Sequence, residues 1–438
     1  MADRHVLRRS WSVCPVCLTT VPAERVRIGS EVYLCKTCEQ HGDFKTVIWR
    51  GCLDFDAWVG EEPLPLQHPR CPGGCGLCRD HLRSTCCVIL NVTDRCNLNC
   101  RFCFSDRSHN STDPSISELT RSLEALIDRG KTLIQLSGGE PTVRDDLPAI
   151  IRAARTNGAR YVQLNTNGIR LSGNRDYVRE LAEAGLSFVF MQFDGTDDEV
   201  FRQLRGRPLL DIKKQAIETC AGFNIGVTLV PTLVRGINDR QIGDILAFAT
   251  AHSPAVRGVH FQPVAFFGRI PRTPVDADRI TLDELMSEIR IQTGGRIREE
   301  HLLPSCCDHP LCGFHGDFVI DRDAMIPLLR RGTSPGRCPD PAAAEKNREF
   351  VARRWLRTEL QQGGAGECCT DIHDMEYFVK KVRESGFTVT AMAFQDAGNL
   401  DVTRLRRCSL HVFDNGRFVP FCSYYLSGWS HENAPRRH

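Results

Sequence analysis

The sequence lacks the features of several large protein classes. Its 56 basic and 54 acidic residues nearly cancel, leaving a formal charge of +2, which argues against a polybasic nucleic-acid binder. The longest apolar runs, such as residues 186–193, are far shorter than the roughly 18 residues that a membrane-spanning helix needs. No apolar core follows Met1, so we expect no signal peptide and a cytoplasmic protein.

Two common catalytic signatures are also absent. The chain has neither a glycine-lysine phosphate-binding loop nor an H-E-x-x-H zinc motif, and we expect His260, within a predicted strand, to be a packed histidine. Cysteine, in contrast, is abundant, with 22 residues. A cytoplasmic compartment keeps thiols reduced, so clustered cysteines there indicate metal binding or redox chemistry rather than disulfides.

The first cluster contains two cysteine pairs, Cys14 with Cys17 and Cys35 with Cys38. Two C-x-x-C pairs at this separation are typical of a closed, four-thiolate zinc ribbon or a rubredoxin-type iron site. Such a metal is structural, because it replaces the core that about 50 residues cannot build alone. The loop between the pairs mixes charges and has no basic stripe, so it predicts no nucleic-acid binding.

Two further clusters each place three cysteines on one loop. Cys71, Cys75 and Cys78 are interleaved with glycines, which favours an iron–sulfur cluster over an incomplete zinc site. The fourth ligand of this cluster is not determined, and the alternatives are His81, a distant cysteine and a substrate. The third loop carries Cys96, Cys100 and Cys103 directly after an apolar strand, with Phe102 and Phe104 placed to shield a cluster whose fourth iron is left open.

Strands and helices alternate after the third loop. Apolar β-rich runs predict strands at 88–93, 132–136, 161–165, 187–193, 226–230 and 259–264, with helical periodicity between them. Six alternating strands imply parallel pairing in an α/β open barrel, whose active site lies at the carboxyl ends of the strands. Polar turns follow four of these strands, at Gly138-Gly139-Glu140, Asn165 to Gly168, Gln192 to Gly195, and Gln262. Turn chemistry explains any one of them, but four at one rim predict a site.

Cys96, Cys100 and Cys103 after the first strand, with Gly138-Gly139-Glu140-Pro141 after the second, resemble the radical S-adenosylmethionine (SAM) superfamily. The resemblance implies a partial (β/α)6 TIM-like barrel, a 4Fe–4S cluster on the three cysteines and SAM bound at the open iron. It also implies that SAM is cleaved to a 5′-deoxyadenosyl radical that abstracts hydrogen from an unactivated carbon. The implied cofactor-binding residues are Ser137, Gly138, Gly139 and Glu140 at the methionine amino group, Asn165 and Asn167 at the ribose or carboxylate, and Gln192 and Asp194 at the same rim.

The flanking cysteines are similar to one branch of that superfamily, which contains tetraether lipid synthases and radical SAM pterin methyltransferases. The branch implies zinc or iron in the ribbon and two auxiliary 4Fe–4S clusters, one on Cys71, Cys75 and Cys78. The ligands predicted for the second are Cys307, Cys312, Cys408 and Cys422. Cys338 is a candidate to complete the Cys71 cluster, with Cys368 and Cys369 as alternatives, whereas Cys52, Cys86, Cys87 and Cys220 are expected to be small core residues.

Four regions are therefore expected. They are a zinc-ribbon or rubredoxin-like module at 1–60, a linker with an auxiliary cluster loop at 61–85, the partial barrel at 86–300 and an iron–sulfur region at 301–438. The predicted function is a radical SAM transferase that forms a C–C bond at an unactivated carbon of a lipid or small molecule, by lipid-chain coupling or by methylation. A peptide maturase and a non-catalytic iron–sulfur or zinc-binding module are the alternatives. The expected partners are a reductant such as flavodoxin or ferredoxin and the substrate, with membrane-surface contact if that substrate is a lipid.

Overall fold

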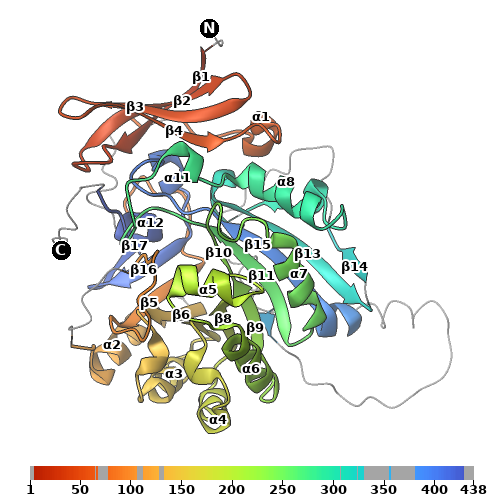
Figure 1. The fold of residues 1–438 in the computed structure, drawn as a ribbon. Helices are drawn as coiled ribbons and strands as arrows, with labels where there is room; N and C mark the ends of the chain where they lie inside the picture. The colour runs from red at the N-terminus through yellow and green to blue at the C-terminus, as the bar shows by residue number, and fades with distance from the viewer. Residues whose placement is uncertain are drawn as a thin grey trace, which may run out of the picture.

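The N-terminal region forms a small antiparallel sheet of its own. The computed structural model describes residues 4–64, 66–67, 77–105, 112–127, 133–305, 307–322, 324–329, 355–356 and 380–428. Four strands pair in chain order, namely β1 (Arg4–Val13), β2 (Thr20–Ile28), β3 (Glu31–Cys38) and β4 (Gly42–Trp49), and helix α1 (Phe55–Val59) follows. This sheet, red in Figure 1, lies at one end of the molecule and confirms the predicted ribbon module.

A second sheet of 13 strands contains the remaining described strands. Its parallel centre has the order β15-β11-β9-β8-β7-β6-β5-β16. These strands are β5 (Cys87–Thr93), β6 (Leu133–Gly138), β7 (Tyr161–Thr166), β8 (Phe188–Gln192), β9 (Gly226–Val230), β11 (Val256–Pro263), β15 (Gly386–Met392) and β16 (Leu410–Asp414). Antiparallel or short strands complete it, namely β10 (Thr232–Leu233), β12 (Leu303–Pro304), β13 (Gly313–Asp321), β14 (Ala324–Pro327) and β17 (Arg417–Pro420).

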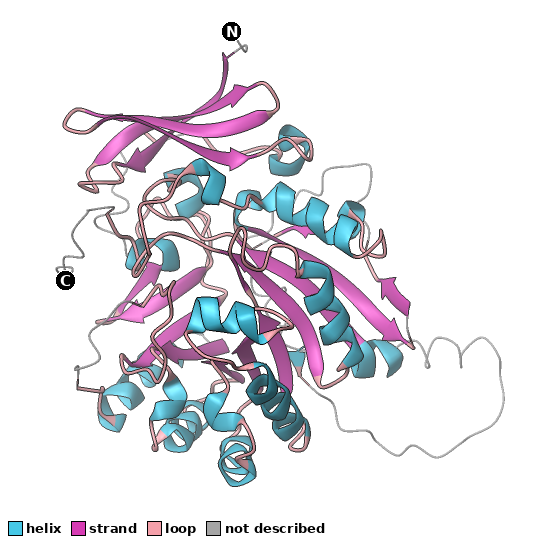
Figure 2. Cartoon of the chain, in the orientation of Figure 1, coloured by secondary structure: helices cyan, strands magenta, loops and turns pink. Residues whose placement is uncertain are grey.

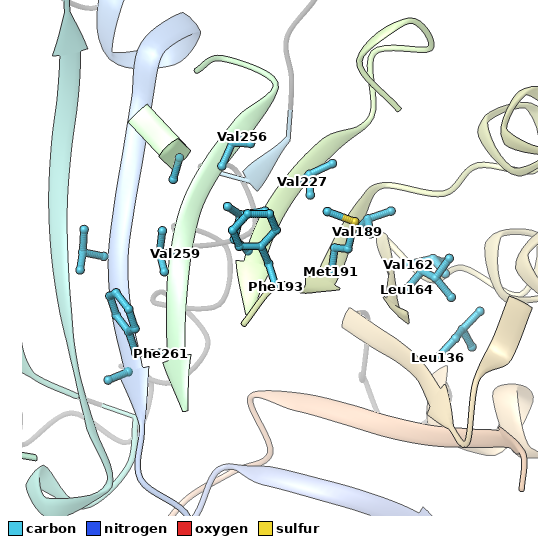
Figure 3. Packing of buried hydrophobic residues seen from close by; sticks show 14 of the residues in the cluster. Leu136, Val162, Leu164, Val189, Met191, Phe193, Val227, Val256, Val259 and Phe261 are labelled. Atoms are coloured by element: carbon cyan, nitrogen blue, oxygen red, sulfur yellow. The ribbon is translucent and has the colours of Figure 1, made fainter. Parts of the chain in front are cut away.

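Helices cover the outer face of this sheet (Figure 2). They are α2 (Ile116–Ile127), α3 (Leu147–Thr156), α4 (Arg175–Glu183), α5 (Asp198–Arg205), α6 (Leu210–Ala221), α7 (Ile242–Ala251) and α8 (Leu282–Gln292), with α11 (Val402–Leu405) and α12 (Phe421–Tyr424) near the C-terminus. Apolar side chains such as Leu136, Leu164 and Val189 fill the layer between helices and sheet (Figure 3). No helix among the described residues is long and apolar enough to span a membrane.

The predicted α/β partial barrel is confirmed, and its six predicted strands correspond to β5, β6, β7, β8, β9 and β11. Helix α5 and the pairing of strands β15 and β16 with the barrel sheet were not predicted. Helix α5 was missed because it is short and mostly charged or polar. Strands β15 and β16, from the region expected to carry iron–sulfur clusters, extend the barrel sheet on both sides, and such long-range pairing leaves no local signal.

Buried ion pairs join the ribbon sheet to the C-terminal region. Arg25 on β2 donates to the carboxylates of Asp401 and Glu62, at 2.7 Å each. Lys36 on β3 is also buried and donates to the carbonyl oxygen of Ala397 at 2.6 Å, and burial lowers its pKa to about 7. Because unpaired buried charges are strongly destabilising, these contacts fix the ribbon against the barrel's C-terminal extension.

Candidate active site and metal centres

The ribbon contains a group of four metal-binding side chains, Cys14, Cys17, Cys38 and His41, whose ligand atoms all lie within 4.8 Å of one another. The Sγ atoms of Cys17 and Cys38 are 3.9 Å apart, and His41 Nδ1 lies 3.6 Å from Cys14 Sγ and 3.5 Å from Cys38 Sγ. A tetrahedral zinc site with Zn–S of about 2.3 Å and Zn–N of about 2.0–2.1 Å has S–S edges of about 3.8 Å and S–N edges of about 3.6 Å. These contacts therefore fit a zinc ion with three thiolates and one imidazole.

Cys35, the predicted fourth ligand, is not part of this group, and His41 takes its place. Burial alternates along β3, so Cys38 lies on the same face as Leu34, whereas Cys35 lies on the opposite face. A spacing of three residues brings two thiols together on a turn but separates them on a strand. Hydrogen bonds favour two of the thiolates, because Thr19 lowers the pKa of Cys17 to about 6 and His41 lowers that of Cys38, whereas burial raises the pKa of Cys14.

The loop with Cys96, Cys100 and Cys103 leaves the carboxyl end of β5 and is fixed by two neighbouring segments. The Arg101 amide donates to Leu204 O at the end of α5 at 3.0 Å. Cys103 forms a backbone bridge with Arg269, which follows β11, through bonds of 3.2 and 2.8 Å. The loop conformation therefore depends on elements more than 100 residues away in sequence.

The three thiols converge in an apolar environment. They share one cluster of buried and half-buried side chains with Phe201 and Leu209. Burial raises the pKa of Cys96 to about 12 and also raises that of Cys103, and the Cys100 charge adds to both shifts. Three thiols in an apolar environment with little solvent suit a soft iron–sulfur cluster, so the residues fit the cofactor that the sequence predicts.

The Gly138-Gly139 turn after β6 lies against the start of the cysteine loop. Gly139 and Glu140 donate backbone N–H bonds to the carbonyls of Thr93 and Arg95, both at 2.8 Å. A Cβ on Gly138 would lie 2.1 Å from Thr93 O, and one on Gly139 would lie 2.2 Å from Arg95 O. Only glycine permits this approach, so the turn and the cysteine loop form one rim.

The Glu140 carboxylate is occupied by protein donors. It accepts from the Thr142 and Thr166 hydroxyls, both at 2.6 Å, and from the Asn167 amide, also at 2.6 Å. Asn167 in turn donates from its side chain to Asn97 on the cysteine loop at 2.7 Å. Glu140 and Asn167 therefore brace the rim of the barrel.

Lys213 on α6 is a further member of this network that the sequence did not indicate. Its Nζ donates to Asn167 O at 2.5 Å, and burial lowers its pKa to about 8. The sequence could have indicated this residue through its position, because Lys213 lies among the buried residues of helix α6 and lysine is rarely buried without a specific partner.

At the end of β8, the Asp194 carboxylate forms a buried bidentate pair with Arg205, with both bonds at 2.7 Å. Gln192 accepts from the same guanidinium at 2.8 Å when its amide oxygen faces it. Arg205 also interacts with the Cys100 thiol, so it places a positive charge beside the cysteine loop. The other two predicted contacts, Ser137 and Asn165, lie on the inner face of the barrel at the ends of β6 and β7.

The predicted C-terminal cysteine ligands lie in two separate groups. Cys312, Cys408 and Cys422 are close enough to influence one another, and burial together with its neighbours raises the pKa of Cys408. Arg404 donates to Cys312 Sγ at 3.6 Å, a long contact. Cys307 instead interacts with Cys86, which the sequence had placed among plain core residues.

Cys78 lies beside the same region. The carbonyl of Cys78 accepts from the His81 amide at 3.0 Å, and the His81 ring bonds Cys408 O at 2.8 Å. The other two cysteines predicted for that loop, Cys71 and Cys75, lie outside the described residues, as do Cys338, Cys368 and Cys369. The auxiliary ligand sets therefore stay predictions.

Comparison with known proteins agrees with this geometry. Residues 90–249 match the radical SAM superfamily, and residues 6–50 match the HMPTM N-terminal zinc ribbon domain. The chain is 32% identical to the 7,8-dihydro-6-hydroxymethylpterin dimethyltransferase of Methanocaldococcus jannaschii, over 95% of this chain and 93% of that protein. It is 31% identical to a probable GTP 3′,8-cyclase of Methanothermobacter thermautotrophicus over 38% of this chain and 55% of that protein.

Among solved structures, the radical SAM methyltransferase TsrM of Kitasatospora setae superposes with a TM-score of 0.33 at 12% identity, covering 40% of this chain and 35% of that one. The similarity to the pterin dimethyltransferase is decisive, since the alignment spans 95% of this chain, including most of its ribbon and barrel. The chain therefore belongs to the radical SAM superfamily, and it is an enzyme that uses a 4Fe–4S cluster and SAM and holds a metal in its N-terminal ribbon.

Proposed function

We propose that this enzyme methylates a pterin-class small molecule, forming a C–C bond at an unactivated carbon. The observation that carries the proposal is the 32% identity to a pterin dimethyltransferase across almost the whole of both chains. In the net reaction, one SAM leaves as methionine and 5′-deoxyadenosine, which carries away the substrate hydrogen. A second SAM supplies the methyl group and leaves as S-adenosylhomocysteine, and the reductant supplies two electrons, so two S–C bonds and one C–H bond break as the C–C bond and the new C–H bond of 5′-deoxyadenosine form. Lipid-chain coupling is less favoured, because polar side chains such as Gln135, Gln163 and Asn165 interrupt the inner positions of β6 and β7.

Each part of the rim has a distinct role in this proposal. Cys96, Cys100 and Cys103 hold the 4Fe–4S cluster, which when bound supplies the electron that cleaves SAM. The Gly138-Gly139 turn allows the SAM methionine group to approach backbone atoms closely. Glu140 acts by positioning the rim, because its carboxylate is occupied by protein donors.

Aromatic side chains close the side of the cysteine loop. The Phe104 ring lies 4.9 Å from Tyr425 and 5.5 Å from Phe421, both from the C-terminal extension. The buried Phe421 and Tyr425 rings exclude water from this side of a site where a reactive radical must be protected from side reactions, and Phe104 itself is 38% exposed.

The C-terminal region supplies the auxiliary clusters in this proposal. We assign one cluster to the loop of Cys71, Cys75 and Cys78, and a second to Cys307, Cys312, Cys408 and Cys422, as the sequence predicts. The proximity of Cys312, Cys408 and Cys422 supports the second set. A flavodoxin or ferredoxin is the proposed source of electrons, and the cytosol the proposed location.

The test is an anaerobic assay of reconstituted protein with SAM, reductant and 7,8-dihydro-6-hydroxymethylpterin. We expect 5′-deoxyadenosine together with a pterin product whose mass shows methyl groups in place of hydrogens. The Cys100→Ala variant is the matched control and should form neither. SAM cleavage without a methylated pterin, over a range of pterin concentrations, would refute the proposed substrate while leaving the superfamily assignment intact.

A further inference from the structure

The turn from Cys14 to Cys17, at the end of β1, carries two of the side chains that fit the ribbon metal. It is closed by hydrogen bonds of its own. The Leu18 amide donates to Cys14 O at 3.0 Å, and the Val16 amide donates to Cys14 Sγ at 3.4 Å. Because an N–H bond to a ligand sulfur orients that ligand, a metal bound here also fixes the backbone of the turn.

Residues 425–428, at the end of the C-terminal region that the structure describes, pack directly on this turn. A Cβ on Gly428 would lie 2.6 Å from Val16 O, so the two backbones are in contact. Tyr425 belongs to an apolar cluster against which Leu18 also packs. The segment follows α12, which is only one helical turn long, so tertiary contacts rather than regular structure hold it in place.

The same segment also contacts the part of the chain that holds the cysteine loop. Ser427 is buried, and its hydroxyl oxygen accepts from the Gly268 amide at 3.0 Å. Gly268 has a φ of +65°, and a Cβ there would lie 2.3 Å from Cys103 O, so only glycine permits this approach. The next residue, Arg269, forms the backbone bridge with Cys103. Ser427 therefore holds the two residues that hold Cys103.

Tyr425 adds a second connection between the segment and the cysteine loop. Its hydroxyl accepts from the Asn91 side chain at 3.2 Å, and Asn91 lies on β5, the strand from which the loop leaves. Its ring lies 4.9 Å from the ring of Phe104, the residue after Cys103. A continuous set of contacts therefore runs from the metal-binding turn of the ribbon, through residues 425–428, to the Cys103 end of the loop.

We propose that the metal-binding turn of the ribbon positions the Cys103 end of the cysteine loop through residues 425–428, with Ser427 as the positioning residue. The ribbon metal then acts on the radical site as well as stabilising its own module. Radical chemistry requires closely fixed reactants and little water, and both depend on a loop that does not open. The inference goes beyond the proposed function and holds for any substrate.

The test follows cluster loss from the anaerobically reconstituted holoprotein in the presence of an iron chelator, by EPR of samples that are reduced and frozen at intervals. Subtracting the spectrum of the same protein with Cys100→Ala isolates the cluster on the cysteine loop. Ser427→Ala leaves the Gly268 amide without its acceptor. Loop opening, and with it the decay of this signal, should become about tenfold faster, the effect of losing one buried hydrogen bond. Ser30→Ala makes the same change at an exposed turn and should decay as the wild type does.

A second variant tests the connection to the ribbon itself. Gly428→Val places a side chain against Val16 O and should separate residues 425–428 from the metal-binding turn without touching the cysteine loop. It should accelerate the same decay. His41→Ala, which removes a side chain from the metal group, should accelerate the decay in the wild-type background and add little to Gly428→Val, because both changes break one path.

The cycle separates this path from a general loss of stability, which would make the two effects additive. Additive effects of His41→Ala and Gly428→Val would therefore overturn the inference. Decay at the wild-type rate in both Ser427→Ala and Gly428→Val would overturn it as well. Methylation of the pterin by the wild-type enzyme is a separate measurement, so the proposed function stands or falls independently of these results.

Discussion

His41, rather than Cys35, is predicted to be the fourth ligand of the ribbon metal, and two single substitutions separate the two residues. His41→Ala removes the imidazole whose Nδ1 lies 3.5 Å from Cys38 Sγ. Cys35→Ser removes a thiol on the opposite face of β3. We expect the first substitution to cost metal affinity and the second to leave it unchanged.

The size of the effect follows from the ligand count. Structural zinc sites of this kind bind with about 10–16 kcal/mol, so an equal share for each of four ligands is about 3 kcal/mol, or roughly a hundredfold in affinity. The loss also affects folding, because the four-stranded sheet has a small core of its own and the metal stabilises the turns at its end. The ribbon should therefore become protease-sensitive in His41→Ala.

The assay is a competition titration of zinc against a chromophoric chelator, on protein whose iron–sulfur clusters have been reconstituted. His5→Ala is the matched histidine control, since His5 is exposed on β1 far from the ligand group. Limited proteolysis then reports the ribbon separately from the barrel. Zinc affinity lost in Cys35→Ser and retained in His41→Ala would refute the tetrahedral interpretation of the four contacts.

Three further predictions concern the barrel. Cys100→Ala should abolish SAM cleavage and leave the ribbon zinc in place, as measured by mass spectrometry and metal analysis; cleavage by a cluster-loaded variant would contradict it. Arg205→Gln removes a buried cation beside Cys100 and should make the cluster potential more negative in an EPR-monitored titration, whereas Arg202→Gln, an exposed change on the same helix, should not shift it. His260 has a pKa lowered by burial from 6.5 to about 4, so between these values the unfolded chain binds a proton that the folded chain does not. The free energy of unfolding should then fall by up to about 1.4 kcal/mol for each pH unit between these two values as the pH is lowered. Chemical denaturation at several pH values should show a weaker pH dependence of this free energy in His260→Gln.

The features that the sequence predicted are those encoded by local periodicity. Alternating apolar runs identified β5 to β9 and β11, and the close spacing of Cys96, Cys100 and Cys103 identified the cysteine loop. Each of these patterns lies within a window of a few residues to about twenty. The order of the central strands then follows from the preference of consecutive β-α-β units for neighbouring parallel strands.

The features that were missed depend on contacts between distant segments. Cys35 and Cys38 look like a metal-binding pair until β3 places them on opposite faces, and His41 joins the group of side chains that could hold a metal only through the turn that follows. The pair of Asp194 with Arg205 joins the end of β8 to the end of α5, a helix the sequence did not indicate. Spacing rules assume a local backbone conformation, and the assumption fails where a strand replaces a turn.

The polar inner face was present in the sequence as interruptions of otherwise apolar strands. Gln135, Gln163 and Thr228 each break a run that a strand buried in a parallel sheet would keep apolar. Each replacement lowers stability unless a partner satisfies the polar atom, and two of these atoms have no partner among the described residues. Gln163 and Thr228 therefore lower the stability of the barrel centre, since both are fully buried and no contact among the described residues compensates their unpaired atoms.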